Sequence, residues 1–146
     1  MLVFAVLIAP LLVFRTLGFV GVSALASWQA SARDALAVML FFTAGSHFTA
    51  MRRDFIRMVP PWVPWPGAMV YFTGICEIAG AVGLLLPGLH CAAGICLIIF
   101  FLAILPANIH AARAGITLRG EAATRLVLRI PMQLLFIAWA AWSTLT

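Results

Sequence analysis

The sequence predicts an all-α integral membrane protein, and three observations support this fold class. Hydrophobic residues make up 65% of the 146-residue chain and charged residues 9%, whereas a soluble domain has about 45–50% and about 25%. Four segments approach the length of about 20 apolar residues that spans a bilayer. All nine cations are arginines, and most lie in the links between these segments. Because these links are short and join hydrophobic segments, we expect the arginines to contact lipid headgroups and no nucleic acid.

The N-terminal region, residues 1–34, is expected to add a further transmembrane helix over roughly Leu2–Ser27. It contains the stretch VSALAS, which has the small-residue spacing of a signal-peptidase site, so cleavage is the alternative. We favour a retained helix because the region has no basic start and Arg15 interrupts its apolar run. A cation near mid-membrane costs about 2.5–3.5 kcal/mol. Arg15 should therefore face the bundle and contact carbonyl groups or an anion, with Glu77 as the leading candidate.

The remaining region, residues 35–146, contains the four clearer candidate spans. They are Ala35–Met51, Gly67–Pro87, Cys91–Ala111 and Ile130–Thr146, the last of which can be extended to include Leu126–Leu128. With five spans in total, the two arginine-rich links, which carry Arg57 and Arg119, lie on the same side of the membrane. The positive-inside rule makes that side cytoplasmic, with the N-terminus inside and the C-terminus outside.

The link between the second and third predicted helices has the sequence RRDFIRMVPPWVPWPG. Its four prolines prevent a continuous helix. Phe55, Trp62 and Trp65 are expected at headgroup depth, where aromatic residues are enriched. Two interpretations follow: the link is an interfacial anchor, or it forms a lid over a cavity between the helices.

One acid, Glu77, interrupts the third predicted span. It lies ten residues after Gly67, which places it about 15 Å along the helix, near the bilayer centre. The side of the helix that carries Glu77 has small residues and one hydroxyl near it, and the opposite side is bulky and apolar. The first side holds Val70, Thr73, Gly74, Gly80, Ala81 and Leu84, and the second holds Phe72, Ile75, Val82 and Leu86. Because small residues allow helices to approach, Glu77 should face the bundle.

Other polar residues are predicted at about the same end of the bundle, about 6–8 Å below the arginine-rich surface. Pro106 lacks an N–H and leaves the carbonyl of Leu102 free for another donor. The residues that could line one cavity opening to this side are His47, Glu77, Asn108, Arg129 and Gln133. Ionisable groups inside a membrane are functional candidates.

A purely structural interpretation is the alternative for this set. Asn, Gln and His join membrane helices through hydrogen bonds worth about 0.6 kcal/mol each, and this role is favoured for Asn108 and Gln133 taken alone. For Glu77 we favour function, because a neutral Gln would join helices at lower cost. The cysteines form no CxxC pair, and we predict neither a disulfide nor a metal site from them.

Five segments, in this order and spacing, resemble the DoxX-like family of small bacterial membrane proteins. They are AGSHF (44–48), RMVPPWVPWPG (57–67), GICEIAGAVGLLLPG (74–88), LPANIHAAR (105–113) and RIPMQ (129–133). The resemblance covers roughly Ala35–Trp142 and implies a four-helix bundle in the cell (inner) membrane, to which residues 1–34 add a helix. It also implies a role for the same five residues that the depth argument selects, and its named members resemble subunits of membrane redox systems.

We therefore expect a membrane subunit that binds a lipophilic small molecule, quinone-like in type, for a redox partner. The expected ligand-binding residues are the five above together with Arg15. A quinone suits an apolar cleft with a few polar groups. The sequence contains no self-contained catalytic motif, so a partner protein would supply the electrons. Two alternatives stay open: an assembly or stability factor without a ligand, and a small proton-linked transporter that uses Glu77.

Overall fold

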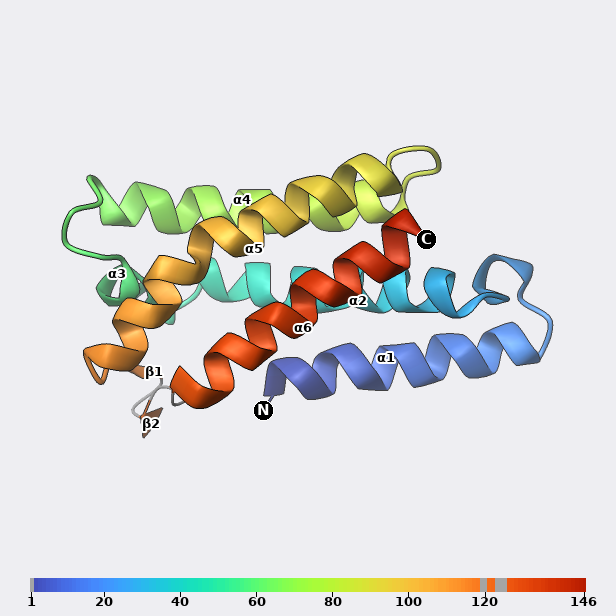
Figure 1. Ribbon diagram of the computed structural model, residues 1–146, viewed down its shortest axis with the longest axis horizontal. Coiled ribbons are helices and arrows are strands. Elements are labelled where there is room, and N and C mark those ends of the chain that lie inside the picture. The colour runs from blue at the N-terminus through green and yellow to red at the C-terminus, as the bar shows by residue number, and fades with distance from the viewer. Residues whose placement is uncertain (1, 119–120, 123–125) are drawn as a thin grey trace.

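The computed structural model describes residues 2–118, 121–122 and 126–146, and among these the side chains of 117–118, 121–122, 126–127 and 129 are not described. The regular structure of the described chain is helical, as predicted, except for one short strand pair that was not predicted. Its long helices are α1 (Leu2–Phe19), α2 (Trp28–His47), α4 (Pro66–Leu85), α5 (His90–Arg113) and α6 (Leu126–Leu145) (Figure 1). The short elements are η1 (Ser23–Leu25), α3 (Arg52–Met58) and the antiparallel strands β1 (Thr117–Leu118) and β2 (Glu121–Ala122).

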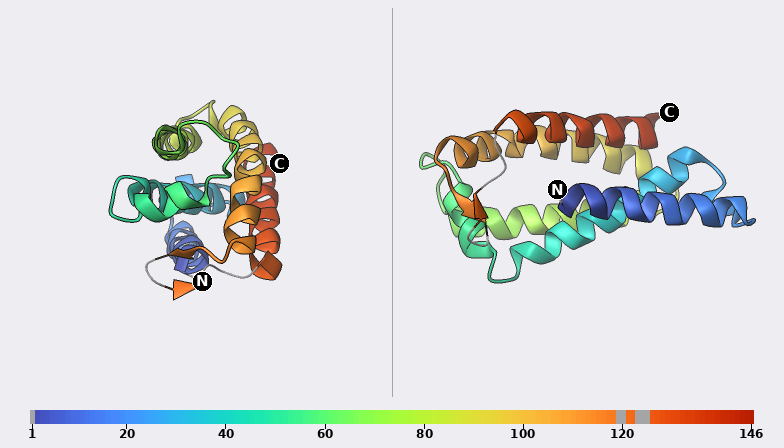
Figure 2. Two further views of the ribbon diagram at one scale, coloured as in Figure 1. Left: turned by 90° about the vertical axis from the view of Figure 1, so that its left-hand side faces the viewer. Right: turned by 90° about the horizontal axis from the view of Figure 1, so that it is seen from below.

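Four of the long helices form a ring in which each packs against its neighbours: α2 on α4, α4 on α5, α5 on α6, and α6 on α2. Helix α1 packs against α2. Seen from the end that carries α3, α5 and α6 lie on one side, and α4, α2 and α1 follow one another on the other (Figure 2). Within the core the largest fully buried side chains are those of Leu7, Leu36, Met39, Leu40, Leu84 and Leu97.

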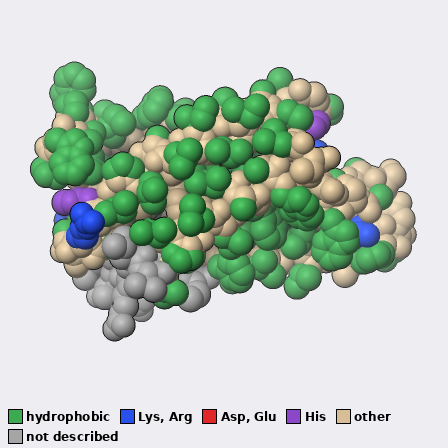
Figure 3. Space-filling view, viewed as in Figure 1, with side chains coloured by type: hydrophobic (Ala, Val, Ile, Leu, Met, Phe, Trp, Pro, Cys, Tyr) green, Lys and Arg blue, Asp and Glu red, His purple; other side chains and the backbone are tan. Residues whose placement is uncertain are grey.

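The helices have the length and composition of membrane spans. Among the described residues, α1, α4 and α5 are each long and apolar enough to cross a bilayer. Helix α2 qualifies together with α3, from which it is bent by 93°, and α6 contains a shorter apolar stretch, Ile130–Leu145. Apolar side chains cover the middle of the face seen in Figure 3, with histidine and arginine side chains towards its two ends. These features agree with an integral membrane protein.

Several helix ends differ from the prediction, and local capping explains two of them. Helix α2 begins at Trp28, seven residues before the predicted Ala35, because the side chain of Ser27 accepts a hydrogen bond from the Ala30 backbone N–H at 3.0 Å. The expected division at residue 35 therefore falls inside this helix. Helix α1 ends at Phe19 rather than near Ser27, and Gly21 then adopts a φ of 114°, which favours glycine.

The two arginine-rich links lie at the same end of the bundle. Helix α3 contacts both α5 and β1, which brings the link after α2 next to the link after α5. The turn between α4 and α5, which contains Gly88, lies at the opposite end (Figure 1). The described residues of the two links therefore lie at one end of the bundle, as expected. Arg119 lies outside the described residues, and the side of the membrane on which the links lie stays a prediction.

This arrangement predicts the accessibility of introduced cysteines in whole cells. The background lacks the three native cysteines, and a membrane-impermeant maleimide is added to intact cells. Arg57→Cys and Arg113→Cys should then either both react or both be protected, and Gly88→Cys should behave in the opposite way. All three positions are exposed. Opposite labelling of positions 57 and 113 would contradict the placement of α3 beside β1.

Candidate functional site

A cavity of about 600 Å³ lies in the half of the bundle that carries α3. Its walls come from α2, α4, α5 and α6, with α3 and the following residues 59–63 across its end and the first residues of α1 at one side. Most of its lining is apolar. The polar side chains that line it are Thr43, Ser46, His47, Thr73, Glu77, Asn108 and Gln133. This volume lies in the range of about 300–1,000 Å³ that small-molecule sites occupy.

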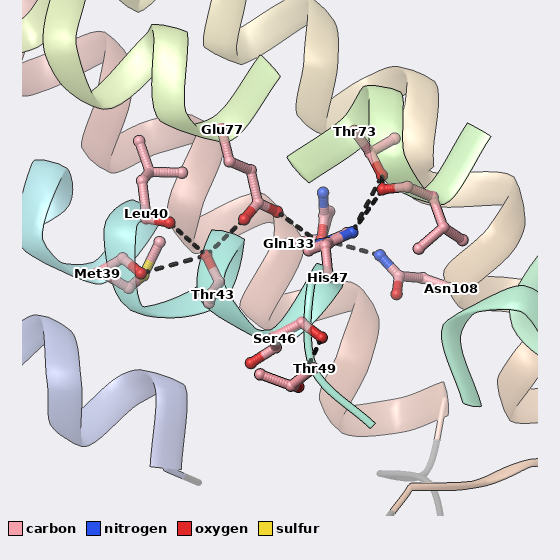
Figure 4. Close-up of polar contacts among 11 residues, drawn as sticks. Met39, Leu40, Thr43, Ser46, His47, Thr49, Thr73, Glu77, Asn108 and Gln133 are labelled. Atoms are coloured by element: carbon pink, nitrogen blue, oxygen red, sulfur yellow. Dashed lines mark hydrogen bonds and ion pairs between the residues drawn. The ribbon is translucent and has the colours of Figure 1, made fainter. Parts of the chain in front are cut away.

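Glu77 faces the bundle as predicted, and its residue is 7% exposed. Its carboxylate contacts two side chains from α2, one on each oxygen (Figure 4). The Thr43 hydroxyl donates to Oε2 at 2.8 Å, and His47 Nε2 lies 3.5 Å from Oε1. Thr43 and His47 are one helical turn apart, so one face of α2 supplies both partners. The buried acid is thus compensated by side chains from a single neighbouring helix.

The orientation of the His47 ring is fixed by the backbone of α4. Its Nδ1 lies 2.9 Å from the carbonyl oxygen of Val70. Because a carbonyl only accepts hydrogen bonds, Nδ1 carries a hydrogen and Nε2 is directed at Glu77. The hydroxyl of Thr73 donates to the same carbonyl at 2.9 Å and lies 3.3 Å from Nδ1. Two residues of α4 therefore hold the histidine in place.

A glycine allows α2 and α4 to approach at this point. A Cβ atom built on Gly74 would lie 2.8 Å from the Cβ of His47 and 3.1 Å from a ring atom of Phe48. Both distances are shorter than side-chain contacts normally allow. Gly74 lies one turn before Glu77 on the same face, so the close approach and the acid–histidine contact are at the same level of the bundle.

Helices α5 and α6 supply the second polar pair. Gln133 Nε2 donates to the carbonyl of Phe101 at 2.7 Å, and Asn108 Nδ2 donates to Gln133 Oε1 at 3.2 Å. Pro106 was expected to free the carbonyl of Leu102, but the bond goes to Phe101, one residue earlier. The bond from Gln133 therefore does not use the carbonyl freed by Pro106, and the expectation of another donor at Leu102 stays a prediction.

The segment after α2 contributes to the cavity wall. The rings of Phe55 and His47 have centroids 4.7 Å apart, so α3 packs directly on the candidate site. Trp62 also lines the cavity. The centroid of its ring lies 6.5 Å from the centroid of the His110 ring on α5. The same Trp62 is 72% exposed and Trp65 is 80% exposed, as expected of interfacial anchors. The segment therefore lines the cavity and also exposes two aromatic side chains, and its role as an interfacial anchor stays a prediction.

Two of the predicted site residues, Arg15 and Arg129, are not among the described residues that line the cavity. Arg15 lies in the last turns of α1 and donates to the carbonyls of Leu25 and Ala26 at 3.2 and 2.7 Å. Its guanidinium also lies over the rings of Phe19 and Trp28. The predicted partner Glu77 is wrong, because α1 ends early and its return loop supplies carbonyl acceptors. Arg129 belongs to α6, but its side chain is outside the described part.

Sequence reasoning missed Thr43 and Ser46 as lining residues. A signal for Thr43 was present, because it lies four residues before His47 and hence on the same helical face. The three cysteines are free. Among the described residues, no group of three or more His, Cys, Asp and Glu side chains could hold a metal ion.

A family model described as Domain of unknown function (DUF8561) matches residues 36–144. The chain belongs to this family. The matched region contains α4, α5, nearly all of α6 and most of α2, and so includes every polar residue of the cavity wall. No curated protein and no solved structure matches the chain. The resemblance to DoxX-like proteins stays a prediction.

The close approach at Gly74 predicts a site-specific loss of stability. Gly74→Ala should lower the free energy of unfolding by about 1–3 kcal/mol, because the new methyl group must displace His47 or separate the helices. Gly45→Ala is the matched control: apart from its chain neighbours and the backbone of its own helix turn, no atom lies within 4 Å of a Cβ built at Gly45. Thermal unfolding in detergent compares the two variants. Equal melting temperatures would contradict the tight contact.

Proposed function

We propose that this protein binds a lipophilic small molecule of quinone type in the cavity, as a membrane subunit for a redox partner. The observation that carries the proposal is a cavity of about 600 Å³ whose polar groups include a buried acid–histidine contact. A site of this kind accepts an apolar body and orients a polar head.

The apolar lining suits a ring with a flexible tail. Aromatic rings come from Phe42, Phe55, Trp62, Phe100 and Phe136, and four methionines, Met51, Met58, Met69 and Met132, also line the cavity. Aromatic side chains pack against planar rings. Methionine adapts its shape to irregular ligands, because it is unbranched and its thioether is polarizable. Such a wall favours a prenylated or acylated ring over a small, strongly hydrated solute.

Electron transfer would require a partner protein. The sequence contains no redox-active motif, so the proposed role for this subunit is to bind the quinone and position its head. The resemblance of five segments to DoxX-like proteins, some of which resemble subunits of membrane redox systems, supports the same role.

A second candidate function is a structural one, in which the polar cluster joins helices of an assembly factor without a ligand. It is favoured by the observation that Gln133 and Asn108 direct hydrogen bonds to protein acceptors. Polar residues of this kind stabilise contacts between membrane helices. The two functions differ in their expected response to filling the cavity: a binding protein should lose its bound ligand, whereas an assembly factor has no ligand to lose.

Filling the cavity should abolish ligand retention and leave the fold intact. Ala107 lines the cavity on α5, and Ala92 is exposed on the same helix. Ala107→Phe should remove bound quinone from protein purified from native membranes, because its ring occupies the space of the ligand. Ala92→Phe should retain it. Mass spectrometry of extracted lipids measures quinone per mole of protein. Equal quinone content in both variants would exclude this cavity as the site.

Replacing the acid separates the two candidate functions. In Glu77→Gln, the new amide can accept from Thr43 and donate to a neutral His47, so the melting temperature should stay unchanged or rise. If the cavity binds a ligand whose head donates a hydrogen bond to the acid, retention of quinone and hydroquinone together should fall about tenfold, since a hydrogen bond to a charged group contributes about 1.5–3 kcal/mol. A stable variant with unchanged quinone content would instead favour the structural role.

A further inference from the structure

The contact between His47 and Glu77 limits the hydrogen bonds that a ligand can make with the acid. His47 Nδ1 carries a hydrogen, because it faces the Val70 carbonyl at 2.9 Å. The other nitrogen, Nε2, lies 3.5 Å from Glu77 Oε1. Without a proton between them, the lone pairs of a neutral ring and an ionised carboxylate would face each other. One proton therefore lies between these two atoms.

The position of that proton does not change what Glu77 offers to the cavity. If His47 holds it, Glu77 is an ionised carboxylate and only accepts hydrogen bonds. If Glu77 holds it, its single O–H is directed at His47. A second proton on the pair would leave a net positive charge inside the membrane, which is costly. In both neutral forms the carboxyl group presents only acceptor lone pairs to a ligand.

The hydroxyl beside Glu77 and one N–H of each nearby amide are directed at protein atoms. The hydroxyl of Thr43 donates to Glu77 Oε2 at 2.8 Å, and a carboxylate is a stronger acceptor than the nearby carbonyls of Met39 and Leu40, each at 3.1 Å. Gln133 directs an N–H at the Phe101 carbonyl, and Asn108 directs one at Gln133. A ligand head that reaches Glu77 must therefore bring its own donor.

We propose that Glu77 makes the cavity select the reduced, hydroquinone form of its ligand over the oxidised quinone. This inference rests on the proposed function. The oxygens of a quinone are carbonyls, which only accept, whereas a hydroquinone carries two O–H donors. A quinone oxygen placed against Glu77 would bring two acceptors together and leave both desolvated. The hydroquinone instead forms a charge-assisted hydrogen bond with the acid.

Three matched probes test this selectivity: a short-tailed benzoquinone, its hydroquinone, and the dimethyl ether of that hydroquinone, which has no donor. Their binding to the protein in lipid nanodiscs is measured anaerobically by equilibrium dialysis against empty nanodiscs. The hydroquinone should bind about tenfold or more tightly than the other two. Equal affinities, or tighter binding of the quinone, would overturn this inference and leave the proposed binding function standing. If no probe binds, both fail.

Two acid-to-amide variants assign the selectivity to Glu77. In Glu77→Gln the amide brings an N–H donor of its own, so the affinities for hydroquinone and quinone should come within a factor of about three. Asp34→Asn is the control, because Asp34 lies in α2 beside Arg33, with 3.7 Å between their charged groups, and is not among the residues of the cavity wall. It should keep the full preference. A preference retained in Glu77→Gln would show that another group causes it.

Discussion

The burial of one carboxyl group, that of Glu77, is the constraint on which the geometry of the site depends. An acid placed near the middle of a membrane helix is costly unless protein groups compensate it. Here the compensation comes from α2, through Thr43 and His47, and it requires α2 and α4 to lie close together. Gly74 permits this approach. The acid, its two partners and the glycine therefore form one unit in which a change at any member alters the others.

The cavity exists because the helices pack tightly at one end of the bundle and less tightly at the other. Near the turn between α4 and α5, Cβ atoms built at Gly80 and Gly83 would lie 2.5 Å from Leu97 and 2.9 Å from Ala93. Such short distances mean that the helices are in close contact there. Towards α3 the two helices diverge (Figure 1), and Pro106 interrupts the hydrogen bonds of α5. The space left between them is part of the cavity, whose lining is mostly apolar and includes the polar residues.

Helical periodicity and depth explain why much of the site could be predicted. The side of α4 that carries Glu77 is buried and the opposite side is exposed, as expected from residue size alone. His47, Glu77, Asn108 and Gln133 were selected as one set, and all four line the cavity. Arg15 was expected to contact carbonyl groups or an anion, and it contacts carbonyl groups. Which carbonyls these are could not be predicted, because this depends on where α1 ends and how its loop returns. The carbonyls that pair with Arg15 belong to that loop, whose conformation no periodicity specifies.

Helix α1 contributes to the cavity wall differently from the other long helices. It lies outside the residues matched by the family model, yet Leu2 and Val3 line the cavity. Its contribution to the wall is apolar, while every polar lining residue comes from the matched region. Arg15 holds the other end of α1 to the loop that leads into α2. The helix therefore closes one side of the cavity without changing the hydrogen bonds available to a ligand. Under the proposed function, α1 would contact the lipophilic tail of the ligand, and Glu77 with its partners would determine which head binds.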